Sequence, residues 1–427
     1  FWINAFFKEL NIEGKEKEGK VLDVIKYIEM PVADVIAKME NRGIMIGDEV
    51  IKQLELLLKT EIEKVKKEIF TEIGHEFNLN SPKQLSDVLY QELHLPTVLT
   101  GKNKWSTKEE VLLELIPHHP SIEGLLKYRE LSKLLTTYIV PLADIASKNK
   151  GVVRTDFRQA GASSGRFSSV NPNLQNIPAR GDWGNEVRKI FVAREGFKFV
   201  GADYSQIEFR VMADISEDPE LIKEFAENVD IHIATASHVF KKELSEVTKE
   251  ERGAGKTINF AILFGQTPYG LSKMLRIDQK IAKSYIDEYF KHYAGVAKYI
   301  ENSKEAAYKD GYVQSMLGRT RYINGVFSKN RNLKEAAMRE AINMPIQGGE
   351  ADIVRLAMIK LDKLMNEKYK DKAFMLLQIH DELVFEVKES EVEGFKKDVY
   401  EVMKNVIQLK VPLDVHISEG NNLSDLK

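Results

Sequence analysis

Two aspartates lie where segments with the character of short strands end, and their carboxylates have the chemistry to bind metals. Asp203 follows the apolar run FKFVGA, and Asp381 lies beside Glu382 at the tight junction within FMLLQIHDELVFEV. Phosphoryl transfer needs charge neutralised on the attacking oxygen, the leaving oxygen and the phosphorus, and two metals about 3.5–4 Å apart do this. Magnesium prefers carboxylate oxygens as ligands. The pair is therefore a candidate two-metal site, although a lone aspartate in this setting is more often an ordinary turn residue.

The segment ERGAGKTINFAILFG (251–265) contains a second set of residues that could bind phosphate. Its GAGKT string resembles the end of a phosphate-binding loop, but that motif requires a glycine five positions before Gly255, where Glu250 stands. The preceding residues VTKEER are charged, unlike the buried strand that leads into such a loop. The segment therefore predicts one long helix, with Gly265 at the position of a C-terminal cap.

One face of this predicted helix combines cations with aromatic rings, because residues four positions apart lie along a slowly drifting face. The residues on this face are Arg252, Lys256, Phe260 and Phe264. Such a face can hold a triphosphate at its cationic end and stack on a base at its aromatic end. A stripe of core aromatic residues flanked by solvated charges fits the same spacing. Gly253 and Gly255 each weaken a helix by about 1 kcal/mol, so something other than propensity must favour it.

The composition excludes several classes of protein. The chain has 427 residues, a net charge of −3 and 43% hydrophobic residues, which is enough for two to four substructures. Near-neutrality predicts an asymmetric surface if the protein binds a polyanion. Because there is no cysteine, disulfides, thiolate zinc sites and cysteine nucleophiles are excluded. No apolar run reaches the roughly 18 residues of a membrane helix, and the first residues, FWINAFFKEL, lack the basic region of a signal peptide.

Helical periodicity covers much of the chain. Residues 48–70 carry apolar residues at steps of three and four, with Asp48 at the expected N-cap. Ser81 followed by Pro82 predicts another helix start. Two later helices are expected to be separated by a break near Pro345 and the two glycines that follow it. The further helical segments are 121–146, 218–310, 331–343 and 350–366.

Shorter segments predict strands and irregular backbone. Residues 163–178 are rich in Ser, Asn, Gly and Pro and predict irregular backbone. Residues 197–203 predict a buried strand, and 374–387 predict a hairpin. In its second arm the side chains alternate, with Phe385 on one face and Glu386 on the other, which is the period of a half-buried strand. Strands distributed among helices predict an α+β fold.

Three of these segments resemble motifs A, B and C of the A-family DNA polymerases, the DNA polymerase I type. They are DYSQIEFR (203–210), RGAGKTINFAILFG (252–265) and QIHDELVFE (378–386). Other segments resemble the family in the same order, and the resemblance covers nearly the whole chain from about residue 25. These are FNLNSPKQLSDVLY (77–90), YRELSKLLTTY (128–138), SGRFSSVNPNLQNIP (164–178), DIHIATA (230–236) and INMPIQGGEAD (342–352). So many ordered matches make coincidence negligible.

The resemblance implies a right-hand polymerase fold of the α+β class. It would contain an antiparallel palm sheet, a helical thumb that grips the duplex backbone, and helical fingers. Residues 1–44 would be an N-terminal segment that leads into the palm. The other implied divisions are the thumb at 45–136, palm at 137–215, fingers at 216–316 and a second palm segment at 317–427.

The resemblance also implies which residues perform catalysis. Asp203 and Asp381 would bind two Mg²⁺ ions, for which Mn²⁺ can substitute, and the backbone carbonyl of Tyr204 would add a ligand. Glu382 would be a supporting carboxylate. Lys256 would protonate the pyrophosphate leaving group as a general acid.

A further set of residues would contact the incoming nucleotide. Glu208 would be the steric gate against a 2′-hydroxyl, and Phe260 would pack on the sugar and base. Outside the family context, His232 would be interpreted as a helix-surface histidine. The complete implied set is Gln206, Glu208, His232, Arg252, Lys256, Phe260 and Phe264.

Residues from several segments would contact primer, template and minor groove, or support the closed site. Minor-groove acceptors are shared by all correct pairs, so Arg and Gln there can sense pair shape without reading sequence. Outside the family context, Arg166 would be a loop arginine and Gln347 a polar residue at a helix break. The implied set is Lys133, Arg166, Asn173, Gln175, Arg339, Gln347, Gln378 and His380.

The sequence departs from the family pattern at a few positions. Phe264 stands where a tyrosine is usual, which removes a hydroxyl near the templating base and leaves base-pair checking open. Gly255 stands where another small residue is usual, and with Gly253 it predicts a more pliable helix. Phe209 replaces a leucine, and Leu423 replaces a tryptophan. None of these changes affects the expected metal ligands, so we expect an active enzyme.

We therefore expect a DNA-directed DNA polymerase that adds dNTPs to a primer 3′-OH and releases pyrophosphate. Its partners would be primer–template nucleic acid and dNTPs, and it would be a cytoplasmic monomer without membrane association. We find no exonuclease motif, so the chain is expected not to proofread. Three alternatives stay open: an A-family enzyme with substantial reverse transcriptase activity on RNA templates, a catalytically silent nucleic-acid clamp, and a metal phosphohydrolase.

Overall fold

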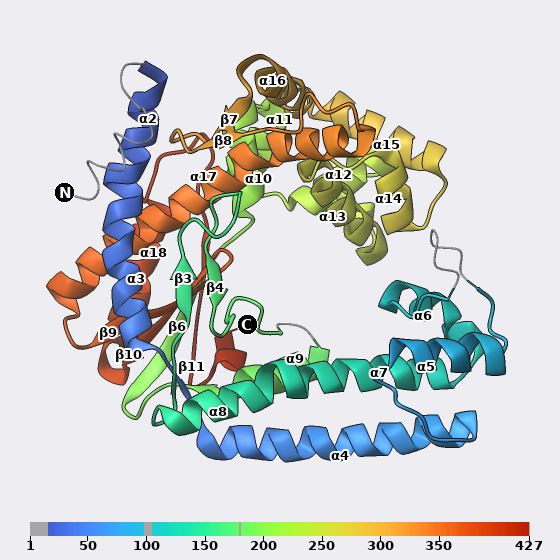
Figure 1. Cartoon of the computed structure of the whole chain (residues 1–427). Coiled ribbons are helices and arrows are strands. Elements are labelled where there is room, and N and C mark those ends of the chain that lie inside the picture. Colours follow the sequence, from blue (N-terminus) through green and yellow to red (C-terminus); the bar gives the residue numbers. More distant parts are fainter. Residues whose placement is uncertain (1–15, 98–104, 179–180, 427) are drawn as a thin grey trace.

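The computed structural model describes residues 16–97, 105–178 and 181–426, and the largest sheet among them, called the central sheet, has four antiparallel strands (Figure 1). Its strands are β6 (Phe197–Tyr204), β9 (Ala373–Ile379), β10 (Glu382–Lys388) and β11 (Val415–Gly420). The strand order is β11–β6–β10–β9, so β6 pairs with two strands that come much later in the sequence. The predicted combination of helices with an antiparallel sheet is confirmed, as is the hairpin formed by β9 and β10.

Helix α18 (Val392–Lys404) covers one face of this sheet. The Tyr204 hydroxyl donates a hydrogen bond of 3.0 Å to the Met403 carbonyl of that helix, and the Phe385 ring packs edge-on against Phe395 at 5.2 Å between centroids. Because side chains alternate between the faces of a strand, Asp203 next to Tyr204 points to the opposite face of the sheet.

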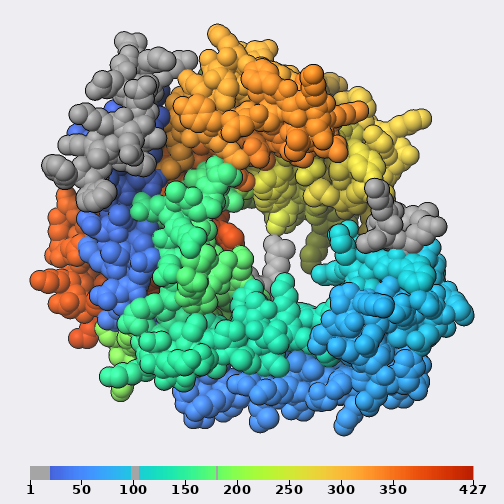
Figure 2. All heavy atoms as spheres, in the orientation of Figure 1, coloured from blue at the N-terminus to red at the C-terminus, as the bar shows by residue number. Residues whose placement is uncertain are grey.

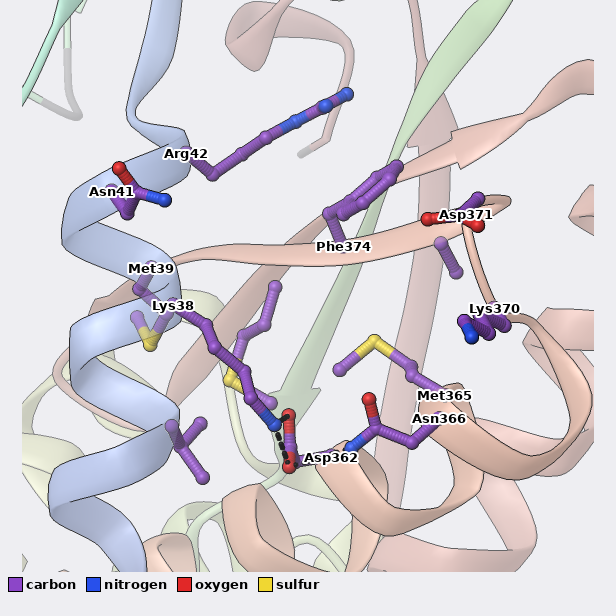
Figure 3. A pocket seen from close by; sticks show the side chains of 13 residues that line it. Lys38, Met39, Asn41, Arg42, Asp362, Met365, Asn366, Lys370, Asp371 and Phe374 are labelled. Atoms are coloured by element: carbon purple, nitrogen blue, oxygen red, sulfur yellow. Dashed lines mark hydrogen bonds and ion pairs between the residues drawn. The ribbon is translucent and has the colours of Figure 1, made fainter.

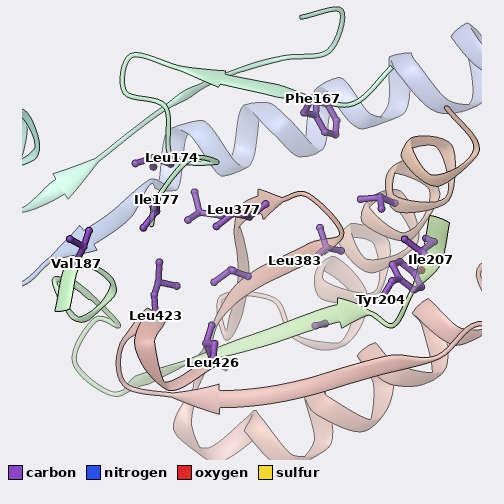
Figure 4. Close-up of a cluster of buried hydrophobic side chains, with 14 of the residues drawn as sticks. Phe167, Leu174, Ile177, Val187, Tyr204, Ile207, Leu377, Leu383, Leu423 and Leu426 are labelled. Carbon is purple, nitrogen blue, oxygen red and sulfur yellow. The ribbon is translucent and has the colours of Figure 1, made fainter. Parts of the chain in front are cut away.

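The apolar core continues from the sheet into the loops that precede it (Figure 4). Leu383 of the sheet is fully buried, and so are Val187 and Leu423, which come from segments far apart in sequence. Leu423 is the position where the resemblance leads one to expect tryptophan, and the smaller side chain still fills a core position. Asp203 in β6 and Glu382 in β10 therefore belong to strands that are anchored by this core.

The expectation that β10 is half-buried is wrong, because both of its faces are covered. Glu386 is fully buried, and its carboxylate accepts hydrogen bonds from Arg42 at 2.5 Å and from Arg194 at 2.8 Å. A buried carboxylate requires this kind of pairing. The alternation of polar and apolar residues in β10 therefore reflects a buried ion-pair cluster and not a solvated face.

Helix α3 (Met30–Arg42) lies along β9 and the long helix α17 (Arg331–Lys368), and the junction contains a cavity of about 390 Å³ (Figure 3). Lys38 crosses this junction to Asp362 with an ion pair of 2.6 Å. The Arg42 guanidinium lies over the Phe374 ring, 3.7 Å from its centroid. These contacts tie the start of the described chain to the outer strand of the sheet.

Helix α17 runs unbroken through Pro345, so the predicted break near Pro345 and the following glycines is wrong. An interior proline costs about 3 kcal/mol, but Pro345 lies in a fully packed part of the helix. The glycines serve close packing: a Cβ at Gly349 would lie 3.0 Å from Val211 Cγ1, and one at Gly348 would lie 3.3 Å from Ser315 Cβ. Burial and close approach therefore outweigh the local helix-breaking tendency.

A helical arm extends from one end of the sheet, with α4 and α7 side by side (Figure 1). Its helices are α4 (Asp48–Ile73), α5 (Pro82–Asp87), α6 (Glu109–Leu115), α7 (Ser121–Lys133) and α8 (Val140–Lys148). The predicted helices over 48–70 and 121–146 are confirmed. Gly47, not Asp48, is the N-cap residue of α4, and Asp48 lies in the first turn. Ser81 caps α5 as predicted, since its side chain accepts from the Gln84 amide.

A second helical group lies across from the arm, and the space-filling view is hollowed between the two (Figure 2). Its helices are α10 (Ile207–Ser216), α11 (Pro219–Ala226), α12 (Ile231–Phe240), α13 (Lys249–Leu263), α14 (Pro268–Leu275), α15 (Gln279–His292) and α16 (Ala294–Asp310). This confirms the predicted helical character of 218–310. In the part of the chain that the structure describes, no helix is long and apolar enough to cross a membrane.

Short elements connect these groups. They are α2 (Glu16–Val24), β1 (Ile44–Ile46), β2 (Val152–Val153), β3 (Asp156–Arg158), β4 (Ser168–Val170), α9 (Gly181–Lys189), β5 (Phe191–Val192), β7 (Tyr312–Gln314) and β8 (Thr320–Tyr322). β1 pairs with β2 and β5, whereas β3 pairs with β4 and β7 with β8. The predicted irregular backbone at 163–178 is therefore interrupted by β4, because Ser168–Val170 pairs with Asp156–Arg158.

Candidate active site

Asp203 and Asp381 meet at the end of the sheet, although they are far apart in sequence. The Tyr204 amide donates to the Asp381 carbonyl at 3.3 Å, and the two aspartate carboxyl groups are close enough for each to affect the pKa of the other. Burial, together with the charges of Asp381 and Glu382, raises the pKa of Asp203 to about 8. Burial also raises the pKa of Asp381. Two buried carboxylates held this close cannot both ionise easily without added positive charge.

Glu382 forms the third carboxylate of this group, which we call the carboxylate cluster (Asp203, Asp381 and Glu382). In the register of β6 and β10, Glu382 is directly opposite Asp203, so both side chains lie on the same face. Gly201 leaves room for it, since a Cβ there would lie 3.1 Å from Glu382 Oε1. The Tyr204 side chain is buried on the other face, so only its backbone is available at this edge.

Arg166 connects this edge to two further carboxylates. Its guanidinium donates to Glu208 Oε1 at 2.5 Å and also to Glu350 of α17. Glu350 is 1% exposed. Burial raises its pKa to about 8, with Glu208 adding to this effect and Arg166 opposing it. Burial likewise raises the pKa of Glu208. Arg166 therefore lies in a partly neutralised network and is not a solvent-exposed loop arginine.

Three polar residues from the predicted nucleic-acid set form a continuous chain of hydrogen bonds. Gln175 Nε2 donates to Gln378 Oε1 at 2.8 Å, and Gln378 Nε2 donates to the His380 carbonyl. His380 has a left-handed backbone conformation with φ of 58°, which turns the chain sharply from β9 into Asp381. The chain of amides thus positions the turn that carries one member of the carboxylate cluster.

Helix α13 is stabilised by its N-terminal cap and by packing, and this explains why its two glycines do not break it. Thr248 and Glu251 form a reciprocal capping box. Gly255 allows α12 to approach closely, because a Cβ there would lie 2.3 Å from the His232 carbonyl oxygen. At the other end, Gly265 has φ of 61° and caps the helix as predicted. Gly255 therefore has a packing role, and the more pliable helix stays a prediction.

Arg252 on α13 is already paired in this structure. Its Nε and Nη2 donate to Asp230 Oδ2 at 2.9 and 2.8 Å. Asp230 also caps α12, because its Oδ1 accepts from the His232 amide at 2.8 Å. Burial acts to raise the pKa of Asp230, but these hydrogen bonds outweigh it and hold the pKa below its usual value. Lys256, one turn further along α13, is exposed.

His232 is buried and neutral, so the interpretation as a helix-surface histidine is wrong. Its side chain is 4% exposed, and its Nδ1 lies 3.0 Å from Asn259 Nδ2. Burial lowers its pKa to about 4, and the nearby cations Arg252 and Lys256 act in the same direction. Because Nδ1 accepts from the Asn259 amide, Nε2 is the nitrogen that carries the proton and can donate to a ligand.

The aromatic side chains of α13 continue into α10. Phe260 stacks on Phe264 with 6.2 Å between ring centroids and contacts Phe209 edge-on at 5.1 Å. Phe209 also packs edge-on against His232 at 5.7 Å. Since Glu208 binds Arg166 beside the carboxylates, two adjacent residues at the start of α10 link the carboxylate cluster to the cationic face of α13.

The remaining predicted residues are distributed around these groups. Gln206 precedes α10 with φ of 54°, and Asn173 is exposed, with its Oδ1 accepting from the Gln175 amide at 3.0 Å. Gln347 is half-buried on α17, one turn from Glu350. Two others lie farther out: Arg339 packs against Gly265 at the end of α13, and Lys133 is exposed in the last turn of α7.

Three residues with evident positions in the site were not among the predicted ones. Asp230 and Glu350 lie inside segments that carry the family resemblance, but nothing in their spacing shows that they pair with Arg252 and Arg166. Asn259 lies inside the helix segment, where an amide among apolar residues signals a buried hydrogen-bond partner. Their partners come from distant segments, so sequence spacing alone does not find them.

Comparisons with known proteins identify the family. The sequence model of DNA polymerase family A matches residues 48–425. The chain belongs to DNA polymerase family A. It is 42% identical over 401 residues to DNA polymerase I of Caldicellulosiruptor bescii, and 41% identical over 417 residues to the thermostable DNA polymerase I of Thermus aquaticus. These alignments cover 94% and 96% of this chain but 47% and 50% of the relatives. The chain thus spans about half the length of these family members.

A solved structure from the same family extends the likeness to three dimensions. It is described as the POL domain of Pol1 from M. smegmatis in complex with DNA primer–template and dNTP. The match has a TM-score of 0.91 and 36% sequence identity, and it covers 99% of this chain and 74% of that one. The arrangement of sheet and helices is therefore that of a family A polymerase domain.

Proposed function

We propose that this chain is a template-directed DNA polymerase that transfers nucleotides from dNTPs to a primer 3′-OH and releases pyrophosphate. Family membership supports the reaction class. The observation that carries the proposal is the meeting of Asp203 and Asp381 at one buried edge, within reach of the network that leads to α13.

The proposed architecture assigns the central sheet to the palm, the arm of α4–α7 to the thumb, and the group of α11–α16 to the fingers. We place the duplex in the hollow between arm and fingers that Figure 2 shows. A basic protein surface is not required for this, because the chain is nearly neutral and phosphate contacts depend on local charge. Primer–template is accordingly the proposed partner.

The donor set at the palm edge fits hard divalent cations. Asp203 and Asp381 offer only oxygen ligands, and the Tyr204 carbonyl is the third proposed ligand. Burial and the charges of Asp381 and Glu382 raise the pKa of Asp203 to about 8, as expected of a site whose negative charges lack a positive partner. When bound, two Mg²⁺ ions would neutralise charge on the attacking and leaving oxygens. The first-row ion Mn²⁺ takes the same oxygen ligands.

The other residues are proposed to bind and orient the nucleotide. Arg252 and Lys256 hold the triphosphate, and Lys256 donates a proton to the leaving pyrophosphate. The neutral His232 donates from Nε2 to a phosphate oxygen. Phe260 packs on the sugar and base, and Glu208 closes the space that a 2′-hydroxyl would occupy.

A second set of residues is proposed to hold the base pair and the primer. Gln175 and Gln378 already form hydrogen bonds with each other, and they present amides of the kind that reads minor-groove acceptors common to all pairs. Arg166 belongs to the same proposed set and is held by Glu208 and Glu350. Side chains that are already fixed in this way can bind the base pair and primer with little loss of conformational entropy.

Primer extension on matched DNA and RNA templates tests the proposal. We expect Mg²⁺-dependent extension that copies the DNA template. Efficient extension only on RNA would instead make the chain a reverse transcriptase. Binding of primer–template without extension would make it a nucleic-acid clamp, and phosphate release without primer or template would make it a phosphohydrolase.

A further inference from the structure

A second group of metal-ligating side chains lies outside the polymerase site, among the helices of the proposed fingers. It contains Glu224 in α11, His238 in α12 and His292 at the end of α15. One ligand atom from each of these side chains lies within 4.8 Å of the other two. In the described part of the chain, this is the one group of three histidine, aspartate or glutamate ligands with that spacing.

The distances within this triad match the edges of a tetrahedral metal site. Glu224 Oε1 lies 3.6 Å from His238 Nε2 and 3.4 Å from His292 Nε2. Zinc bound at 2.0–2.1 Å by tetrahedral ligands gives ligand–ligand separations of about 3.3 Å. The first contact is longer than a hydrogen bond. The His292 contact is within the range of a long hydrogen bond, and a single ion between the three atoms would account for both separations.

The two histidine rings are stacked, with 3.3 Å between centroids and an interplanar angle of 27°. Their side chains are 35% and 22% exposed. Because the Nε2 lone pairs lie in the ring planes, binding of one ion by both atoms requires the two rings to rotate out of this stack.

The surroundings of Glu224 are built to orient a ligand. Its Oε2 accepts a 2.8 Å hydrogen bond from the Tyr293 hydroxyl, which leaves Oε1 directed at the histidines. An oriented ligand of this kind is typical of zinc sites. The buried hydroxyl of the neighbouring Tyr289 has no hydrogen-bond partner among the described residues. Burial raises the pKa of Tyr289, and the charge of Glu224 acts in the same direction.

We propose that Glu224, His238 and His292 bind a zinc ion that links α11, α12 and α15. Two imidazole nitrogens and one carboxylate oxygen suit Zn²⁺ and not Mg²⁺, which prefers oxygen ligands. Water fills the fourth position. The ion stabilises the fold, because it joins three helices that support the pairing of α12 with α13. The proposal does not depend on the polymerase activity.

Visible spectroscopy with Co²⁺ tests the site directly, using the whole chain after treatment with a chelator. Excess Mg²⁺ keeps the carboxylate cluster occupied. We expect one equivalent of Co²⁺ to give the intense absorption of tetrahedral coordination, and Zn²⁺ to displace it. Zn²⁺ should also raise the Tm, because it binds the folded state. Weak octahedral bands alone, or no Tm shift with Zn²⁺, would overturn the proposal.

Variants separate this site from ordinary histidine binding. His238→Gln and His292→Gln change side chains that are partly exposed, so both should fold, and each should weaken Co²⁺ binding by about a hundredfold or more. His75→Gln is the matched control, since His75 pairs with Glu92 at 2.6 Å on the helical arm. Unchanged affinity in both site variants, or equal loss in the control, would show that the triad is only an ion pair.

Discussion

The carboxylate cluster at the end of β6 and the cations of α13 differ in how their charges are compensated. Burial, together with the charges of Asp381 and Glu382, raises the pKa of Asp203 to about 8. Arg252, by contrast, already forms two hydrogen bonds with Asp230. The carboxylates have no cationic partner of this kind, whereas Arg252 has a partner with which a bound triphosphate would compete. Under the proposed function, the first region would bind metal ions and the second would exchange one anion for another.

The largest effect is expected at the carboxylates. Asp203→Asn or Asp381→Asn should reduce single-turnover primer extension by about a thousandfold or more, since metal ions supply several kcal/mol of charge stabilisation. The same variants should raise the Tm in chelator, because they remove like-charge repulsion from a buried site. Asp362→Asn, which changes the ion pair with Lys38 far from the site, is the control. Extension near the unmodified rate would refute the role of the carboxylates.

The second-largest effect is expected at Lys256. Lys256→Ala should lower kcat by about 10²–10⁴-fold if the ammonium acts as general acid, with little change in Tm because the side chain is exposed. Stopped-flow measurement of pyrophosphate release checks this. A rise in KM with unchanged kcat would instead make Lys256 a binding residue only.

Replacing Arg252 should affect nucleotide binding, in contrast to replacing the carboxylates, which should affect the chemical step. Arg252→Ala should raise KM for dNTP by about tenfold to a hundredfold, the value of a charged hydrogen bond. Arg331→Ala is the matched control, since Arg331 pairs with Glu335 on an exposed surface at 2.7 Å. If Asp230→Asn lowers KM, Asp230 competes with the triphosphate; if KM rises, Asp230 positions Arg252.

Glu208 should affect the choice of sugar more than the rate. Glu208→Ala should improve incorporation of ribonucleotides relative to deoxyribonucleotides by about tenfold or more. Arg166 keeps its other partner, Glu350, so the fold around it should persist. Paired extension assays with matched rNTP and dNTP measure the ratio, and an unchanged ratio would exclude the gate.

The smallest effect concerns pH and His232. Its pKa of about 4 in the folded chain lies below the ordinary 6.5. As pH falls through that interval, the unfolded chain takes up a proton that the folded chain does not, so His232 lowers the free energy of unfolding in acid. His232→Gln should reduce the loss of Tm that occurs when the pH is lowered by about three units, from 7.5 to 4.5. His75, whose pKa is raised by its hydrogen bond to Glu92, should give the opposite sign when replaced.

Local patterns predicted the elements better than they predicted partners. The spacing over 251–265 predicts the helix that forms α13, and Ser81 caps its helix as expected. The break predicted near Pro345 is wrong because the helix-breaking tendency of proline is local, whereas the packing that overrides it involves α10 and Ser315. The prediction of a half-buried strand at Glu386 is wrong because the burial of this residue depends on Arg42 and Arg194, which lie far away in sequence.

The same reasoning explains what could be predicted of the site. Asp203 and Asp381 are recognisable from strand ends and from family motifs, and the structure places them together. The neutral, buried state of His232 was not predictable, since it depends on Asn259 and on the ring of Phe209. Pairing across distant segments is a property of the fold, and a spacing pattern does not contain it.

Anomalous scattering tests the central claim most directly. Crystals of the chain with primer–template, a non-hydrolysable dNTP analogue and Mn²⁺ should show two anomalous peaks bridged by Asp203 and Asp381, with the triphosphate against Arg252 and Lys256. Anomalous density that lies elsewhere, with these carboxylates unliganded beside a bound nucleotide, would contradict the account.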